Sequence, residues 1–183
     1  MKIIYSILFA SLFFVGCQPK PDNSAKEAFE KNSKTVMAFL EGFQNENLDY
    51  GAVYSTDVIQ LDSHAGAKKD SLGLDDIKSN DKKGWAFADF KIVSEINLLP
   101  GVNSETKETD GSVRYYGDWE VTIPGTDSTE ARSAVVRLYE SFDFDEEGKI
   151  VFQQYYGDFG GLQKMLSPKE IHEEEGGEEE HSD

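Results

Sequence analysis

The chain is poor in the residues that carry most metal and nucleophile chemistry. Its 183 residues include one cysteine, Cys17, and three histidines, of which only His64 lies outside the last dozen residues. One cysteine excludes an internal disulfide, and one internal histidine excludes a histidine-rich zinc site. The chain also lacks an H-E-x-x-H motif, a phosphate-binding P-loop and a G-x-S-x-G nucleophile elbow. We therefore expect no metal and no cofactor, and any catalysis should be proton transfer by side chains.

Positive charge is scarce as well. Lys and Arg total 18 against 35 Asp and Glu, which gives a net charge of −17. This balance excludes a nucleic-acid partner and charge-driven attachment to an anionic membrane, because both need clustered basic residues. Acid density is highest in residues 169–183, with eight acids and one lysine. We expect residues 167–183 to be a disordered acidic tail that stays solvated, since no calcium-loop spacing is present.

No hydrophobic run is long enough to span a membrane. The longest, Ile3 to Val15, has about 13 residues, whereas a spanning helix needs roughly 20. With Lys2 before it and Gly16 after it, the run predicts a signal peptide at residues 1–16 and a processed N-terminus at Cys17. The alternative is an ordinary signal peptide followed by a stray cysteine.

Phe14-Val15-Gly16-Cys17 resembles a bacterial lipobox, whose cysteine carries palmitate and other lipid. Residues 17–23 would then be the lipidated cysteine and a proline-containing tether. The prediction is an exported protein anchored through Cys17 to a bacterial envelope membrane. Gln18 takes the place of the aspartate linked to inner-membrane retention, which favours the outer membrane.

Residues 24–166 are predicted to form one domain, with helices first and strands afterwards. Ser24 and Glu27 predict a capping box for a helix whose apolar stripe is interrupted at Asn32. Asp49 predicts the cap of a one-turn helix, followed by a strand at 58–62 and a helix from Leu72 to Ala88. After Ala88 the apolar residues recur at every second position, which is the period of a strand. Strands are expected at 90–98, 113–123, 131–144 and 149–156.

Three sequence segments, in their order along the chain, resemble the nuclear transport factor 2-like superfamily, and within it the SnoaL-like group. They are residues 36–43 with 47–50, residues 142–150 and residues 155–162. The resemblance implies an α+β fold in which N-terminal helices pack in the concave face of a strongly bent antiparallel sheet. This cone-like, cystatin-like roll has a pocket at one end. The resemblance also allows a homodimer that forms through the outer face of the sheet.

The resemblance does not imply a single function, because relatives include isomerases, dehydratases, cyclases and epoxide hydrolases as well as proteins without known catalysis. One hypothesis is non-catalytic binding of a small apolar molecule or partner protein at the cell envelope. The other is a cofactor-free isomerase or dehydratase. A purely structural dimer module is a third.

Candidate catalytic residues are carboxylates and the internal histidine. Asp62 and His64 share a face if their strand continues, so the carboxylate could orient the imidazole as a general base; the alternative is a solvated histidine on a loop. Asp158 is either a pocket acid or the cap of a C-terminal helix.

Candidate pocket residues are mostly aromatic side chains that alternate on adjacent strands. They could line a concave wall in which one arginine pairs with an anionic ligand. The alternatives are core or dimer-face aromatics, and an arginine that pairs with Glu120 or Asp118 across the sheet. The residues on the strands are Tyr115, Trp119, Arg137, Tyr139 and Tyr156, and Trp85 in the predicted helix from Leu72 to Ala88 completes the set.

Overall fold

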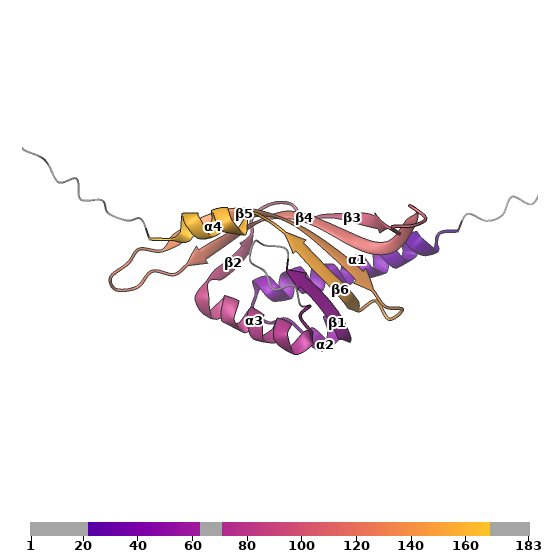
Figure 1. The fold of residues 1–183 in the computed structure, drawn as a ribbon, viewed down its shortest axis with the longest axis horizontal. Coiled ribbons are helices and arrows are strands. Elements are labelled where there is room, and N and C mark those ends of the chain that lie inside the picture. Colours follow the sequence, from indigo (N-terminus) through magenta and orange to yellow (C-terminus); the bar gives the residue numbers. More distant parts are fainter. Residues whose placement is uncertain (1–21, 63–70, 169–183) are drawn as a thin grey trace, which may run out of the picture.

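The computed structural model describes residues 22–62 and 71–168, so the predicted signal peptide, Cys17 and the tail from residue 169 lie outside it. Helices and strands fill this part of the chain from Ser24 to Leu166 (Figure 1). The helices are α1 (Ser24–Gln44), α2 (Tyr50–Val53), α3 (Leu74–Phe87) and α4 (Phe159–Leu166). The strands are β1 (Tyr54–Asp62), β2 (Asp89–Ile92), β3 (Asn97–Val102), β4 (Thr109–Ile123), β5 (Arg132–Phe144) and β6 (Ile150–Tyr156).

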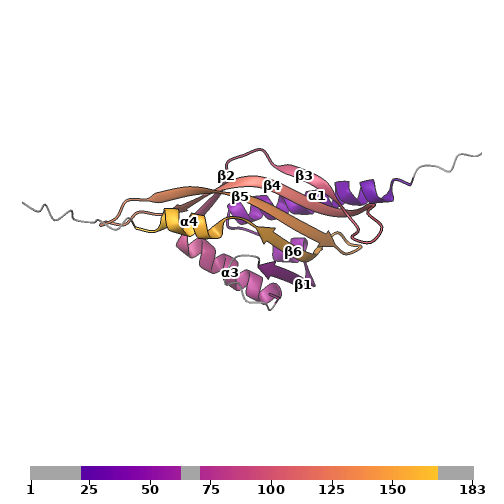
Figure 2. The same cartoon turned by 45° about the horizontal axis from the view of Figure 1, so that its top comes forward.

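All described strands belong to one curved sheet, and the predicted α+β class is confirmed. Its order is β1-β6-β5-β4-β2, and β3 pairs with another part of β4. Helix α1 lies along the concave side, as Figure 2 shows, while α3 and α4 border the same side at one end. The arrangement is the cone-like roll expected from the sequence.

The sheet is mixed rather than purely antiparallel, which corrects one part of the prediction. Strand β1 runs parallel to β6, with Gln60 beside Gln153 and Asp62 beside Tyr155. Every other pairing is antiparallel. A tight turn forces consecutive strands to be antiparallel, but 87 residues separate the end of β1 from the start of β6, so no turn dictates their direction.

The strand predicted at 90–98 is divided into β2 and β3 by a bend. Ile92 pairs with Trp119 and Asn97 with Tyr116, so residues 93–96 lie opposite only two residues of β4. The hydroxyl of Ser94 accepts a 2.8 Å hydrogen bond from the Asp118 amide, which holds the irregular segment in place. Extra residues on one strand bend a sheet, and this bend helps to curve the wall around α1.

Gly117 lies at this bend, on the concave face of β4. The buried phenol of Tyr115 runs along the strand directly above it, and a Cβ at position 117 would overlap the phenol oxygen. We expect Gly117→Ala to lower the free energy of unfolding by about 1–3 kcal/mol, because the ring must leave its well-packed position. Urea denaturation of the full chain measures this. Gly160→Ala in α4, where Asp158 Oδ1 at 3.9 Å is the nearest atom to the new Cβ, is the control, and equal losses in both variants would contradict this expectation.

The core forms between α1 and the sheet. The predicted apolar stripe of α1 is buried, with Val36 and Leu40 at 0% exposure and Phe39 at 6%. Asn32 does not interrupt it: the side chain is buried and its Nδ2 donates a 2.9 Å hydrogen bond to the carbonyl of Gly111. A buried amide with a backbone partner costs little, so a polar residue fits the buried face.

The first two helix starts are at the predicted positions, although one cap differs. Helix α1 begins at Ser24, but Asn23 is its N-cap and no side chain caps it, so the predicted capping box is wrong. Instead the Ser24 amide donates to the carboxylate of Asp22 at 2.9 Å. Asp49 caps α2 as predicted, accepting from the amides of Gly51 and Ala52.

Candidate functional site

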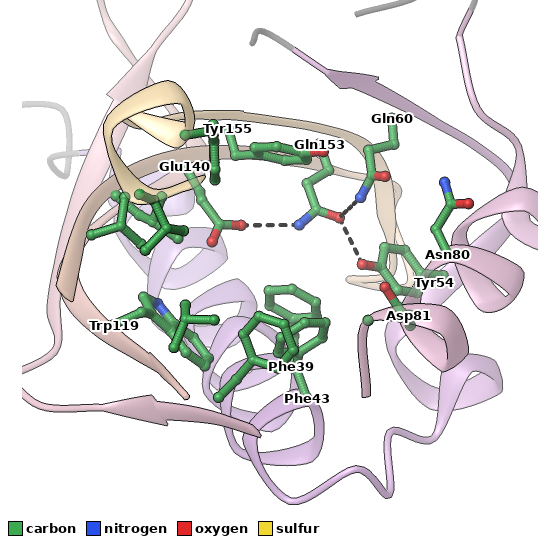
Figure 3. A pocket seen from close by; sticks show the side chains of 17 residues that line it. Phe39, Phe43, Tyr54, Gln60, Asn80, Asp81, Trp119, Glu140, Gln153 and Tyr155 are labelled. Carbon is green, nitrogen blue, oxygen red and sulfur yellow. Dashed lines mark hydrogen bonds between the residues drawn. The ribbon is translucent and has the colours of Figure 1, made fainter. Parts of the chain in front are cut away.

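A cavity of about 300 Å³ opens at the end of the sheet where α3 and α4 meet the concave face. Figure 3 shows aromatic rings on one side of it and a row of polar side chains on the other. All helices except α2, and all strands except β3, contribute to its lining. The lining residues are Phe39, Phe43, Tyr54, Gln60, Asn80, Asp81, Gly84, Phe90, Trp119, Val121, Val136, Leu138, Glu140, Gln153, Tyr155, Phe159 and Leu162.

The aromatic side of the cavity is centred on Phe43 of α1. Its ring centroid lies 5.3 Å from that of Phe90 and 5.7 Å from that of Trp119, both in edge-to-face geometry. Phe39, one turn earlier, lies 6.0 Å from Phe43. Edge-to-face packing of this kind holds the rings in fixed positions, so the wall is preformed for a flat or apolar ligand.

The polar side is a row of hydrogen bonds across β1, β6 and β5 (Figure 3). The Tyr54 hydroxyl and the Gln60 amide both donate to Oε1 of Gln153, at 2.6 and 3.1 Å. Because that oxygen accepts two bonds, the Gln153 amide nitrogen is turned the other way and donates to Oε2 of Glu140 at 3.0 Å. The row therefore ends in a carboxyl group that is directed into the cavity.

Glu140 is the most unusual residue of the site. Only 5% of it is exposed, and its neighbours in the lining are largely apolar. Burial raises the pKa of Glu140 to about 7; the Gln153 hydrogen bond opposes this, and the negative charge of Asp81 adds to it. A carboxyl group with a pKa near neutrality can both take up and release a proton at physiological pH, as general acid–base catalysis requires.

Asp81 of α3 is a second carboxyl group on the facing wall. Its Oδ2 accepts a 2.9 Å hydrogen bond from the hydroxyl of Tyr50 in α2. Burial raises the pKa of Asp81 to about 6, and the bond from Tyr50 partly offsets that rise. Two titratable carboxyl groups from distant segments of the chain thus share one cavity.

The structure divides the predicted pocket residues of the strands between the two faces of the sheet and places Trp85 on α3. Trp119 lines the cavity, whereas Tyr115 and Trp85 pack in or against the core and do not appear in its lining. Arg137, Tyr139 and Tyr156 are not in the lining either. Since side chains alternate along β5, the inward positions of Leu138 and Glu140 turn Arg137 and Tyr139 outward.

Arg137 is paired on that outer face. Its Nε and Nη2 donate to the two carboxylate oxygens of Asp118 at 2.8 and 3.2 Å, which was the alternative interpretation of this residue. The Tyr139 ring lies 5.0 Å from that of Tyr116 and 5.9 Å from that of Tyr156. The predicted homodimer through this outer face stays a prediction.

Of the three predicted catalytic residues, only Asp158 has a described side chain, and it does not line the cavity. Asp158 is the N-cap of α4: its carboxylate accepts a 2.8 Å hydrogen bond from the Gly161 amide, and the residue is exposed. Asp62 ends β1 beside Tyr155, but its side chain and all of His64 lie outside the described residues. Their proposed partnership is therefore still a hypothesis.

The sequence analysis did not identify Glu140 and Asp81 as candidate site residues, although the sequence contains a signal for each of them. Glu140 continues the alternation Ala134, Val136, Leu138, Glu140, Phe142, where one charged residue stands in an apolar series. Asp81 follows Ile77 by four positions and so lies on the same helix face. A charge at a position that periodicity assigns to the core is the signal that would have identified both.

Two further findings concern metal binding and membrane-spanning helices. Within residues 22–62 and 71–168, no group of three His, Cys, Asp or Glu could hold a metal ion. No helix in these ranges is long and apolar enough to cross a membrane.

Several solved structures have a fold similar to that of this chain. A candidate polyketide cyclase from Xanthomonas campestris superposes with a TM-score of 0.61 at 16% identity, covering 76% of this chain and 99% of that one. An LEH-like epoxide hydrolase from M. tuberculosis gives 0.53 at 17%, covering 75% and 85%. A nuclear transport factor 2-like protein from Burkholderia xenovorans gives 0.55 at 12%, covering 75% and 97%.

Comparisons of sequence alone are negative: no protein-family model and no curated protein matches the chain. The structural likeness nevertheless establishes the fold. The chain has the nuclear transport factor 2-like fold, in the form shared with SnoaL-like polyketide cyclases.

Proposed function

We propose that the chain is a cofactor-free acid–base enzyme of the isomerase, dehydratase or cyclase type, in which Glu140 transfers a proton within the apolar cavity. One observation carries this proposal: a carboxyl group buried to 5% exposure ends inside a ligand-sized cavity and accepts its hydrogen bond from Gln153 alone among the described contacts. A carboxylate that served only structure would be expected to pair with a basic residue or several amides.

The cavity supplies what such a reaction needs. Aromatic walls exclude water and hold an apolar molecule, while the row from Tyr54 through Gln153 fixes the orientation of the carboxyl group. Asp81 on the facing wall can exchange a second proton. Solved proteins of the same fold include candidate polyketide cyclases and an LEH-like epoxide hydrolase, so the fold is compatible with an enzyme.

A screen for turnover tests the proposal against the non-catalytic alternative. The full chain is incubated with β,γ-unsaturated ketones, β-hydroxy ketones and small epoxides, and products are followed by mass spectrometry together with a Glu140→Gln variant. Turnover that depends on Glu140 supports the enzyme. Ligands that bind and are returned unchanged by both proteins would favour the binding protein predicted as the first hypothesis.

We also propose that Cys17 is lipidated and that the protein is anchored to an envelope membrane, with the outer membrane favoured. The support is the signal-like sequence at residues 1–16 and the lipobox resemblance of residues 14–17.

Cys17→Ser tests the anchor. We expect the variant to lose its acyl groups and to move from the membrane fraction to the soluble fraction, because one cysteine carries all the lipid. Fractionation followed by mass spectrometry of the N-terminal peptide measures both effects. Ser24→Ala, in the first turn of α1, is the control and should leave the protein in the membrane fraction; a membrane-bound Cys17→Ser protein would refute the prediction.

A further inference from the structure

Among the residues that the structure describes, the cavity carries two acidic groups and no basic one. Glu140 and Asp81 line it from β5 and α3, on facing walls in Figure 3. None of the described residues in the lining is a Lys, Arg or His. Lys78 on α3 is near, but its Nζ lies 5.7 Å from the centroid of the Tyr50 ring rather than in the cavity. Among the described residues, therefore, no lining side chain balances the two carboxylates, and a cationic ligand would do so.

The rest of the lining suits a cation that also has an apolar body. Phe39, Phe43 and Trp119 present ring faces and edges to the same space as Glu140 (Figure 3). Aromatic rings attract an ammonium group through their negative faces and bury alkyl surface at the same time. The net charge of −17 would further draw a cation toward the protein.

Other titratable groups near Glu140 do not change this balance. Those facing it are Asp81 from α3, Tyr54 from β1, Tyr115 from β4 and Tyr155 from β6. Helices α1 and α4 contribute only uncharged side chains to the lining. Burial raises the pKa of Tyr54 and that of Tyr115, so both phenols stay neutral, and Glu140 and Asp81 are the charged groups among the described lining residues.

The geometry points to an apolar amine, bound as its ammonium ion to Glu140 with Asp81 on the facing wall, as the ligand of this cavity. The inference deepens the proposed function by naming the substrate class, and it rests on that function for the identity of the site. A bound ammonium ion stabilises the carboxylate, so Glu140 would act in the complex as a base rather than an acid.

Isosteric ligands test the inference by calorimetry on the full chain. The probes are cyclohexylmethylamine, cyclohexylmethanol and cyclohexanecarboxylate, which share a ring and differ in charge. At pH 8 we expect the amine to bind at least 10-fold more tightly than the alcohol, the gain typical of a charge-assisted hydrogen bond, and the carboxylate not to bind. Because Glu140 must be ionised, amine affinity should fall about 100-fold from pH 8 to pH 5, with protons released on binding.

Variants separate this inference from the proposed function. Glu140→Gln should bring the amine to within about threefold of the alcohol, since only a weak neutral hydrogen bond remains, while Glu130→Gln at an exposed turn should change nothing. Equal binding of amine and alcohol, preference for the carboxylate, or no binding of any probe would overturn the inference. Amine selectivity without turnover would remove only the proposed enzyme, whereas Glu140-dependent turnover of neutral compounds without amine selectivity would remove only this inference.

Discussion

Glu140→Gln lowers the catalytic rate by about 10²–10⁴-fold on any substrate that the full chain converts; this is the expected result if Glu140 moves the proton. Glutamine keeps the size of the side chain and can still accept the 3.0 Å hydrogen bond from Gln153, so the cavity is preserved while proton exchange is lost. KM should change much less than kcat, because the lost interaction belongs to the transition state.

The pH dependence of kcat/KM identifies the role of the group. Because the pKa of Glu140 in the free protein is about 7, kcat/KM for a base-catalysed reaction should rise tenfold per pH unit up to about pH 7 and be level above it. An acid would give the mirror image. Glu130→Gln serves as the matched control and should retain both rate and profile. A Glu140→Gln protein that keeps its rate would remove Glu140 from the reaction.

Glu140→Gln should also make the protein more stable at alkaline pH. In the native state the pKa of Glu140 is raised from 4.5 to about 7, so the folded chain holds this proton more tightly than the unfolded chain. The native protein therefore loses stability as pH rises from about 4.5 to 7, and the loss is complete above pH 7. The shift corresponds to an effect of about 3 kcal/mol, an upper value that relaxation of the cavity would reduce.

Denaturant unfolding at pH 4.5 and pH 8 measures this effect in the full chain and the two variants. The gain in unfolding free energy of Glu140→Gln over the native protein should be present at pH 8 and small at pH 4.5. Glu130→Gln should follow the native protein at both values, because its side chain is exposed. A Glu140→Gln protein less stable than the native one at pH 8 would show that the carboxylate is compensated in the folded state. Loss of activity with gain of stability is the pattern expected where a fold keeps a destabilising group for function.

The sequence alone determined which segments fold and in what form. The stripe at Val36, Phe39 and Leu40 predicted the buried face of α1, and alternation between Val113 and Ile123 predicted the long strand β4. The missing motifs also led to the expectation that any chemistry is proton transfer, which stays a prediction. These features are local, since the period of apolar residues is fixed by the geometry of a helix or strand.

Only the tertiary structure decided which inward-facing positions enclose the cavity. Period two puts Leu138 and Glu140 in the apolar series that faces the core, but it does not say which of these positions pack tightly and which line an open cavity. The choice depends on where α1, α3 and α4 pack, and these contacts join residues far apart in the chain. The same long-range packing set β1 parallel to β6 and brought Asp81 into one cavity with Glu140, 59 positions away in the sequence.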